Sequence, residues 1–482
     1  MPVDRSKFIP RIVVAGTSGD SGKTLVSVGL LAGLRQLGYV TCAFKKGPDF
    51  IDPAWLMAAS GSKVRNLDTF LVDSQKVRTS FITHSDSDSI NLIEGNRGLY
   101  DGFDVDGSHS TAELARLLDA PVILVICATK TTRTLAAVAL GMRQMDPQLN
   151  IAGVILNQVG GSRHRRIASE AIEKYAGLKV IGAVPRISGT SLLPARHLGL
   201  VTPAEYGMTS EITGEIGKLI TDHVDLNRIV EIARRSPDLN FQERTSDRKT
   251  TETKVKIGYF SDSAFTFYYP ENLELLQSLG AELVPISSLS SRKLPGISGL
   301  YIGGGFPETH ADRLAKNHEL KAEIKRGAEN GLPIYAECGG LIYLCRSLKL
   351  KEKTYSMAGV FDIDLAMGEK PHGHGYSRMQ ADLDNEYYPG GIEIRGHEFH
   401  YTYPLSEQIG EKMVLSVSKG TGIAGGRDGL VKQNVFAAYL HVHADGEGSW
   451  ASNLVRLASV YAHRNRNEGF SGGSQLFGRK AV

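Results

Sequence analysis

The sequence predicts an α/β protein of two consecutive domains, each built on a mostly parallel sheet that helices cover. Its 482 residues exceed the size of one ordinary domain. Short β-branched runs alternate with helical stretches from Arg11 to about Thr221, and a second alternation begins at Val255. The stretch between them is polar. We therefore expect domains at 8–233 and 255–463, a linker at 234–254 and a disordered tail at 464–482.

The composition argues against several classes of protein. A net charge of +3 is too small to indicate nucleic acid or an anionic membrane as a partner. The longest apolar runs, such as 121–128, are too short to span a bilayer, and the first residues lack the apolar region of a signal peptide. Four cysteines in a chain of this length do not suggest a disulfide framework. These features predict a reduced, cytoplasmic protein.

The predicted strands of the first domain are continuously apolar, which is typical of strands buried on both faces of a parallel sheet. They are Ile12–Ala15, Val40–Phe44, Ile90–Glu94, Val122–Ala128, Ile151–Asn157 and Val180–Val184. Ser110 and Glu113 have the spacing of a helix capping box. In the second domain we expect a helix near Glu271–Leu279 and strands near Val255–Tyr259, Leu283–Pro285, Gly299–Ile302 and Pro333–Tyr335. Less regular β-like runs follow at Met357–Val360, Ile392–Arg395 and Val435–Leu440.

A glycine-rich loop follows the first strand and opens a segment of helical spacing. Its residues are Gly16, Thr17, Ser18, Gly19, Asp20, Ser21, Gly22, Lys23 and Thr24. In such a strand–turn–helix setting the backbone N–H groups cradle phosphates, the lysine neutralises the outer phosphates and the threonine hydroxyl holds Mg²⁺. The usual motif has four residues between its glycines, whereas Gly16 and Gly22 enclose five. The alternative is a plain strand-to-helix turn, but flanks and chemistry together favour a site for a nucleoside triphosphate.

Acidic and basic side chains follow other strands at the same predicted edge of the sheet. Lys45, Asp49 and Asp52 follow the second strand, where the carboxylates suit Mg²⁺ or a reacting group and the lysine suits phosphate. The alternative is an Asp-Pro turn with solvated lysines. Glu94 ends the third strand, which is the usual position of a second Mg²⁺ anchor, although a glutamate there also serves to bond a neighbouring loop. Asn157 ends a later strand, where such sheets often present an amide to a nucleotide base.

Three stretches, Gly16–Thr24, Lys45–Pro53 and Glu94–Gly102, together resemble the cobyrinic acid a,c-diamide synthase family. The first domain of that family is similar to dethiobiotin synthetase and has a P-loop NTPase-like parallel sheet. The five-residue glycine spacing is the family's own. Thr17 stands where partition-type ATPases carry a signature lysine, which argues against that branch. The resemblance implies an ATP site in which Asn157 lies near adenine, and a set that serves Mg²⁺ and phosphoryl transfer: Thr24, Asp49, Asp52 and Glu94.

The second domain carries the parts of a nucleophile site in order along the chain. Cys338 lies between a predicted strand and helix, where a helix N-terminus lowers a thiol pKa and flanking glycines permit a sharp elbow. Gly304 and Gly305 follow an earlier strand and offer backbone N–H groups as an oxyanion hole. His441 offers a general base and acid. A buried structural cysteine is the alternative for Cys338.

This set resembles a class I glutamine amidotransferase domain of the cobyric acid synthase kind. Two departures stand out. Ala336 opens the elbow where many members have glycine, and His443 stands where most carry a glutamate two residues after the histidine. The third member of a triad is therefore missing, and we expect a Cys338–His441 dyad whose histidine is oriented by a group the sequence does not identify.

Four further histidines resemble a metal cluster, but we do not expect them to form a zinc site. His372, His374, His397 and His400 lie close in sequence, but no cysteine or spaced carboxylate completes a zinc site. The run Arg395–Tyr401 is typical of the same synthase family, which implies a structural or substrate-side role.

The resemblance implies a carbon–nitrogen ligase that uses ATP, Mg²⁺ and glutamine to amidate acetate side chains of a tetrapyrrole, as in cobalamin biosynthesis. Cys338 would release ammonia from glutamine, while the first domain converts a carboxylate into an acyl phosphate that ammonia then attacks. Asn96-Arg97 and the run Thr129–Thr134 look more like a sirohaem-amidating subgroup, and a nickel-sirohydrochlorin diamide synthase is a further relative. We expect glutamine and a tetrapyrrole as partners, with a homodimer as a further option. The rival interpretation is a non-catalytic nucleotide switch, against which Cys338, His441 and Glu94 speak.

Overall fold

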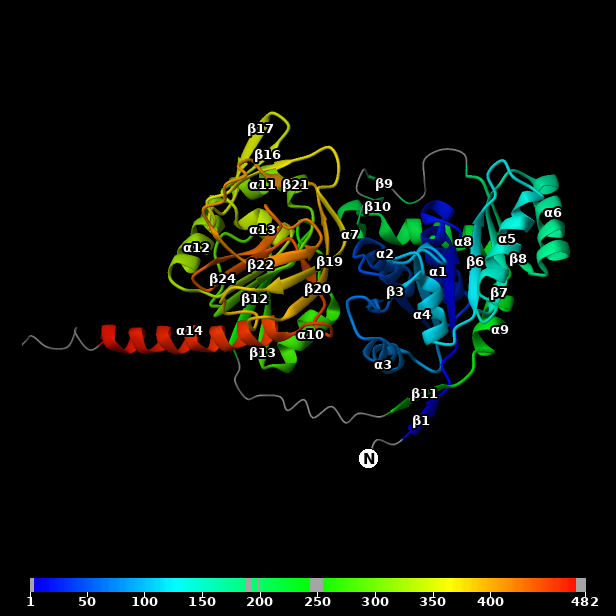
Figure 1. Ribbon diagram of the computed structural model, residues 1–482, viewed down its shortest axis with the longest axis horizontal. Helices are drawn as coiled ribbons and strands as arrows, with labels where there is room; N and C mark the ends of the chain where they lie inside the picture. The colour runs from blue at the N-terminus through cyan, green and yellow to red at the C-terminus, as the bar shows by residue number, and fades with distance from the viewer. Residues whose placement is uncertain are drawn as a thin grey trace, which may run out of the picture. The chain divides into compact units, whose positions relative to one another are not determined.

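The computed structural model describes residues 4–187, 202–242 and 255–473, together with 193, 195–196 and 199–200. Its internal contacts divide the chain into two compact units, Met1–Ser246 and Asp247–Val482. In Figure 1 the first unit runs from blue to green and the second from green to red.

The first unit is built on a seven-stranded sheet in which every neighbouring pair is parallel. In spatial order the strands are β4 (Arg65–Leu67), β3 (Thr41–Lys46), β5 (Ile90–Gly98), β2 (Arg11–Gly16), β6 (Val122–Cys127), β7 (Ile151–Val159) and β8 (Val180–Pro185). All six predicted strands are confirmed. The sequence did not reveal β4, because an Arg-Asn-Leu edge strand has no apolar run.

Helices cover both faces of this sheet. On one face α1 (Lys23–Gln36) packs against α2 (Ile51–Ser60), α8 (Thr209–His223) and α9 (Leu226–Arg234). Right-handed crossovers place α3 (Ser74–His84), α4 (Thr111–Leu117), α5 (Thr134–Met145) and α6 (Ser162–Ala171) on the other face. Glycines allow α1 and α8 to approach closely, since a Cβ on Gly29 would lie 2.1 Å from Ile220 Cγ1. The predicted cap also forms, with Ser110 Oγ accepting the Glu113 N–H at 3.2 Å.

The chain after α9 stays attached to the first unit. Strand β11 (Leu239–Gln242) pairs antiparallel with β1 (Asp4–Lys7). The guanidinium of Arg11, which is buried, donates to the carbonyl of Pro237 at 2.8 Å, and Ser236 Oγ donates to the Arg11 carbonyl at 2.9 Å. The predicted linker thus begins with residues that pack on this unit, while 243–254 lie outside the described residues.

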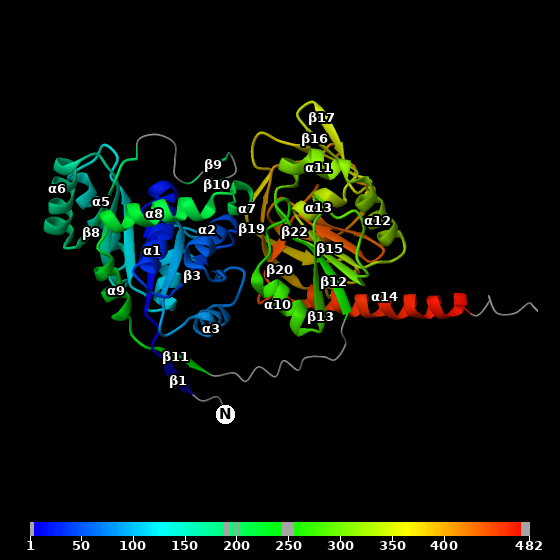
Figure 2. The ribbon, with the colours of Figure 1, turned by 180° about the vertical axis from the view of Figure 1, so that it is seen from behind.

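The second unit combines a parallel half-sheet with an antiparallel one in a single ten-stranded sheet, of which β12, β13, β19, β20 and β22 are labelled in Figures 1 and 2. The parallel strands are β13 (Ala281–Ile286), β12 (Val255–Phe260), β14 (Gly299–Ile302), β15 (Ile334–Glu337) and β24 (Val435–Ala438). The antiparallel strands continue as β23 (Arg427–Lys432), β22 (Lys412–Lys419), β19 (Gly373–Ala381), β20 (Glu393–His400) and β25 (His441–Val442). A four-stranded sheet adds β17 (Lys353–Ser356), β16 (Ser347–Leu350), β18 (Asp364–Met367) and β21 (Thr402–Pro404).

The helices of this unit are α10 (Pro270–Ser278), α11 (Ala311–Lys316), α12 (His318–Glu329), α13 (Gly339–Leu344) and α14 (Ser449–Gly473). Three expectations differ from the structure. The ten-stranded sheet is not mostly parallel, since four of its strand pairings are parallel and five are antiparallel. Met357–Val360 forms no strand: its N–H groups bond to carbonyls at the end of α13 and just beyond, including Tyr343 and Leu344. The chain from Arg464 to Gly473 continues α14 rather than starting a tail, and 474–482 lie outside the described residues. Within the described part, no helix is long and apolar enough to cross a membrane.

Candidate functional site

The glycine-rich loop joins β2 to α1 and folds over the side chain of Lys23. After Ser18 the chain makes one 3₁₀ turn, Gly19–Ser21, and Gly22 then caps α1 with a φ of 91°. The Lys23 ammonium donates to the carbonyls of Ser18 and Gly19, each at 3.1 Å. Burial lowers the pKa of Lys23. A phosphate in this loop would offer the lysine anionic oxygens in place of two neutral carbonyls.

Asn157 contacts the backbone of this loop. Its Nδ2 donates to the Ser21 carbonyl at 3.0 Å, and its Oδ1 accepts the Gln158 N–H at 2.9 Å. A Cβ on Gly22 would lie 2.0 Å from the same Nδ2, so the loop needs a glycine there. The residue predicted to lie near adenine therefore has both polar atoms engaged, and it supports the loop in this structure.

Lys45, the penultimate residue of β3, lies between carboxylates that come from two different elements. Its Nζ donates to Asp52 Oδ2 at 2.7 Å, to Glu94 Oε1 at 3.0 Å and to the Gly95 carbonyl at 3.0 Å. The Thr24 hydroxyl donates to the same Glu94 oxygen at 2.7 Å. The side chains of Lys45 and Glu94 are 1% and 0% exposed. Lys45 thus uses all three ammonium protons to neutralise this cluster.

The charges of the cluster depend on one another. Burial alone would lower the pKa of Lys45, but the carboxylates of Asp52 and Glu94 outweigh burial and raise it. Burial raises the pKa of Glu94, and Lys45 opposes that rise. Asp49 caps α2 by accepting the N–H groups of Ile51 and Asp52 at 2.6 and 3.1 Å. Burial and the Asp52 carboxylate raise the pKa of Asp49 to about 7, so it exchanges its proton near neutral pH.

Thr24, Asp52 and Glu94 present the hard oxygen donors that Mg²⁺ prefers. Glu94 Oε2 is buried and has no hydrogen-bond partner among the residues that the structure describes. A buried carboxylate oxygen without a partner is costly, and a cation would satisfy it. The donor set therefore fits Mg²⁺.

Cys338 forms a strained turn between β15 and α13. Its φ and ψ are 46° and −97°, an unusual conformation for a residue with a side chain. Its N–H donates to the Ala438 carbonyl at 2.7 Å, and its thiol faces the Phe399 carbonyl at 3.8 Å. The turn is also crowded, since a Cβ on Gly340 would lie 2.4 Å from the Ile302 carbonyl oxygen. These features define a nucleophile elbow.

The glycine loop after β14 lies against this elbow. A Cβ on Gly339 would lie 3.0 Å from the Gly305 nitrogen and 3.4 Å from the Gly304 carbonyl carbon. The Gly304 N–H donates to the Phe267 carbonyl at 3.3 Å, whereas no backbone carbonyl is recorded for the Gly305 N–H among the described residues. Of the two predicted oxyanion donors, Gly305 is the better placed, and its nitrogen lies close to Gly339, whose N–H directly follows the nucleophile.

His441 lies between the glycine loop and the end of β15. Its Cε1–Nε2 edge faces Gly304, where a Cβ would lie 2.4 Å from Cε1 and 3.1 Å from Nε2. Its Nδ1 faces Glu337 Oε2 at 3.4 Å, and both side chains are buried. His397 stacks on its ring with centroids 4.8 Å apart.

Comparisons with known proteins agree along nearly the whole chain. A model of the CobQ/CobB/MinD/ParA nucleotide-binding domain matches residues 12–201, and one of the CobB/CobQ-like glutamine amidotransferase domain matches 256–449. The cobyrinate a,c-diamide synthase of Magnetococcus marinus is 39% identical, over 93% of this chain and 97% of the relative. The synthase of Archaeoglobus fulgidus is 40% identical, over 95% and 98%. The chain belongs to the cobyrinate a,c-diamide synthase family.

As a member of the cobyrinate a,c-diamide synthase family, the protein is a carbon–nitrogen ligase that takes its nitrogen from glutamine. Its first unit is a nucleotide-binding domain, and its second is a glutamine amidotransferase domain. The family and the fold class predicted from the sequence are thus confirmed.

In this cobyrinate a,c-diamide synthase relative, the environment of Cys338 differs from the expected one. The sequence predicts a thiol pKa lowered by a helix N-terminus, whereas burial and the nearby Glu308 carboxylate raise the pKa of Cys338. Helix α13 has only six residues and offers little compensation. These surroundings favour the neutral thiol over the thiolate, so attack by the sulfur requires removal of the thiol proton.

The buried histidines His397 and His400 pack against other rings. Burial lowers the pKa of His397 well below its usual value and that of His400 to about 4. His400 Nδ1 bonds the Thr402 carbonyl at 2.9 Å, and its ring stacks on Tyr439 at 3.6 Å. In the described ranges, no three His, Cys, Asp or Glu residues are grouped as a metal site. The run Arg395–Tyr401 contributes the Phe399 carbonyl that faces the Cys338 thiol.

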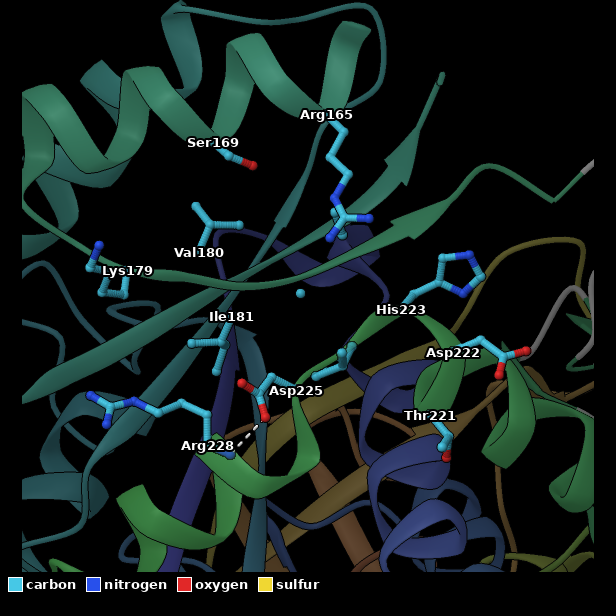
Figure 3. Close-up of a pocket in the computed structure, with 13 residues that line it drawn as sticks. Arg165, Ser169, Lys179, Val180, Ile181, Thr221, Asp222, His223, Asp225 and Arg228 are labelled. Atoms are coloured by element: carbon cyan, nitrogen blue, oxygen red, sulfur yellow. Dashed lines mark hydrogen bonds between the residues drawn. The ribbon is translucent and has the colours of Figure 1, made fainter. Parts of the chain in front are cut away.

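A polar pocket of about 550 Å³ lies along β8 in the first unit (Figure 3). Its lining includes Val180, the first residue of β8, so the pocket reaches the edge of the parallel sheet opposite the phosphate loop. Its charged groups have neighbours of their own: Arg228 pairs with Glu231, and Lys179 with Glu173 at 3.3 Å. We therefore do not assign this pocket to the nucleotide site.

Sequence reasoning overlooked two groups beside the elbow. Glu337 was not considered, because patterns for this class place the acid after the histidine rather than before the cysteine. The Gly339 N–H was also missed as an oxyanion donor. Its position directly after the nucleophile was the available signal.

Proposed function

We propose that this chain uses ATP and glutamine to amidate acetate side-chain carboxylates of a tetrapyrrole, through an acyl phosphate. The proposal assigns the synthetase to residues 8–233 and the glutaminase to 255–463. The observation that supports it is that one chain carries both a phosphate loop with a Lys45–Asp52–Glu94 cluster and a strained cysteine turn at Cys338. The relatives named cobyrinate a,c-diamide synthase support the choice of acceptor.

In the glutaminase half, Cys338 attacks the side-chain amide carbon of glutamine. Its proton passes to His441 Nε2 as the S–C bond forms, and the oxyanion is met by the N–H groups of Gly305 and Gly339. His441 then gives that proton to the leaving nitrogen as the C–N bond breaks, which releases ammonia and leaves a thioester. Water, deprotonated by His441, hydrolyses the thioester to glutamate and restores the thiol.

In the synthetase half, an acceptor carboxylate attacks the γ-phosphorus of ATP and ADP leaves. A carboxylate anion is a poor electrophile, and the resulting acyl phosphate supplies a leaving group that ammonia displaces to give the amide. Lys23 exchanges its loop carbonyls for phosphate oxygens, and Lys45 lies beside the carboxylates where charge develops. Thr24, Asp52 and Glu94 would hold Mg²⁺, which neutralises phosphate charge when bound.

A second candidate acceptor is sirohaem or nickel-sirohydrochlorin, amidated by the same mechanism. Asn96 and Arg97, the residues that suggest this subgroup, follow Glu94 at the carboxyl end of β5, the edge that the phosphate loop shares. Arg97 is exposed and has a positive φ of 50°. Their position at the carboxyl end of β5 supports a role beside the acceptor in this second candidate function.

The test incubates the purified chain with ATP, Mg²⁺, glutamine and one acceptor at a time, and reads amidation by mass spectrometry. Cobyrinic acid, sirohaem and nickel-sirohydrochlorin are the three acceptors. Amidation of cobyrinic acid supports the first candidate, and amidation of cobyrinic acid alone excludes the second. The Cys338→Ala variant should lose glutaminase activity but still amidate with free ammonia. If ammonia supports amidation of none of the three, the synthetase proposal fails.

A further inference from the structure

Glu337, the residue directly before the nucleophile, faces the histidine of the elbow. Its Oε2 lies 3.4 Å from His441 Nδ1, with 1% of the glutamate and 2% of the histidine side chain exposed. Because β15 is paired on both sides, with β14 and β24, the backbone that carries Glu337 and Cys338 is fixed. One short segment thus presents both the thiol and a carboxylate aimed at its base.

A network of buried polar groups holds this carboxylate. The Tyr301 hydroxyl donates to Glu337 Oε2 at 3.4 Å and accepts from Asn272 Nδ2 at 3.1 Å. The same amide bonds the chain just after His441, donating to the Val442 carbonyl at 2.8 Å and accepting the Ala444 N–H at 2.8 Å. The carboxylate and the segment bearing the imidazole are therefore anchored through shared partners.

Residue 443 lies where this enzyme class most often carries the glutamate of its triad, but here it is a histidine with other contacts. His443 Nε2 faces Glu271 Oε2 at 3.5 Å, its Nδ1 accepts the Asp445 N–H at 3.2 Å, and its ring packs on Tyr269 with centroids 4.7 Å apart. His443 thus bonds through Nδ1 and turns Nε2 toward Glu271 without forming a hydrogen bond among the described residues, and neither nitrogen faces the His441 pair. The two histidine–glutamate pairs are equally buried, but only the His441 pair adjoins the nucleophile.

We propose that Glu337 is the positioning residue of the glutaminase site, accepting the Nδ1 proton of His441 so that Nε2 carries no proton and can receive that of Cys338. This inference rests on the proposed roles of Cys338 and His441. Glu337 does not contact glutamine. It fixes the tautomer and ring direction of the base, and its charge stabilises the imidazolium formed when the thiol attacks.

The deciding experiment compares glutaminase kinetics of the full chain with those of Glu337→Gln and Glu337→Asp. Glu337→Gln keeps the shape but loses the charge, and an amide donor opposite Nδ1 favours the wrong tautomer. We expect kcat to fall about 10²- to 10⁴-fold with little change in KM for glutamine. Glu337→Asp should restore part of kcat, because it restores the charge. In ¹⁵N spectra, His441 should lose its Nδ1–H tautomer in Glu337→Gln.

Glu271→Gln is the matched control, since it removes an equally buried carboxylate from the neighbouring pair and should keep kcat near the wild-type value. The inference is overturned if Glu337→Gln retains kcat within about threefold, if Glu337→Asp is no better than Glu337→Gln, or if Glu271→Gln is equally impaired. Cys338→Ala separates the two claims. Glutaminase activity in Cys338→Ala would refute the proposed function itself, whereas an inactive Cys338→Ala with an active Glu337→Gln would refute only the positioning role.

Discussion

The phosphate loop and the cysteine elbow are both strand–turn–helix junctions with a left-handed residue, yet a different kind of residue carries that conformation in each. In the phosphate loop it is Gly22, with φ of 91°, and in the elbow it is Cys338, with φ of 46°. A glycine there lets the backbone itself approach a ligand, whereas a cysteine there projects a thiol out of the turn. In these two junctions, the type of residue that has the positive φ therefore indicates whether the backbone or a side chain contacts the reacting group.

The two junctions also differ in how charge is balanced. Around the phosphate loop, Lys45 offsets the half-buried carboxylate of Asp52 and the buried carboxylate of Glu94. Around the elbow, aromatic rings predominate, and burial raises the pKa of Cys338. The charged groups of the first site are suited to exchanging their ion pairs for contacts with charged ligands. The second site is suited to transferring one proton from the thiol to a neutral base.

The largest effect that separates the sites is expected from Glu94→Gln. The variant leaves Thr24 and Lys45 without their shared carboxylate, and it removes a donor for Mg²⁺. Amidation should fall by about 10³-fold or more, the scale of losing a charge-stabilising group in phosphoryl transfer. Glutaminase activity, measured as glutamate release, should persist, because Glu94 belongs to the other unit.

Asp73→Asn is the control for that variant, since Asp73 caps α3 on the surface of the same unit. It should leave ammonia-dependent amidation intact. Amidation by Glu94→Gln within tenfold of the wild type would mean that the carboxylate cluster is not part of the reacting centre.

A smaller effect is expected from replacing the glycine with positive φ in the phosphate loop, and almost none from replacing a loop glycine that has open space around it. Gly22→Ala places a Cβ 2.0 Å from Asn157 Nδ2 at a φ of 91°. Gly19→Ala meets no atom within 4 Å. We expect Gly22→Ala to cost roughly 1–3 kcal/mol of stability and to weaken ATP binding, and Gly19→Ala to change stability little. Chemical denaturation and nucleotide titration measure both, and equal stability of the two variants would refute the requirement for glycine.

The smallest effect concerns pH. Because the pKa of Asp49 is raised to about 7, above its unfolded value of about 3.9, its folded form holds a proton that the unfolded chain releases. Its contribution to stability is therefore full below about pH 4 and is lost as pH rises through 7. Asp49→Asn keeps the Oδ1 cap on α2 and should flatten this part of the profile. Melting temperatures of both proteins between pH 4 and 8 test it, and parallel profiles would contradict it.

The sequence predicts those features that a local pattern encodes. β-branched runs identify the strands that support both sites, and the glycine turns identify the loops. Patterns fail where pairing decides the structure, as for β4 and β11, which contain no apolar run but pair with Phe44–Lys46 and Asp4–Lys7. They also fail for Glu337, whose significance lies in a contact with a residue 104 positions away.

Lys45 has a consequence for the order in which ligands arrive. Its ammonium is tethered within 3.0 Å of both Asp52 and Glu94, so a dissolved cation must compete with an effective concentration on the order of millimolar or above. Free divalent ions at low concentration are poor competitors against such a tethered charge. A cation bound to nucleotide phosphates arrives together with anionic oxygens. Lys45 can pair with these oxygens instead of with the two carboxylates. If these carboxylates hold Mg²⁺ as proposed, the Lys45 ion pairs favour a metal ion that arrives together with nucleotide over a free metal ion.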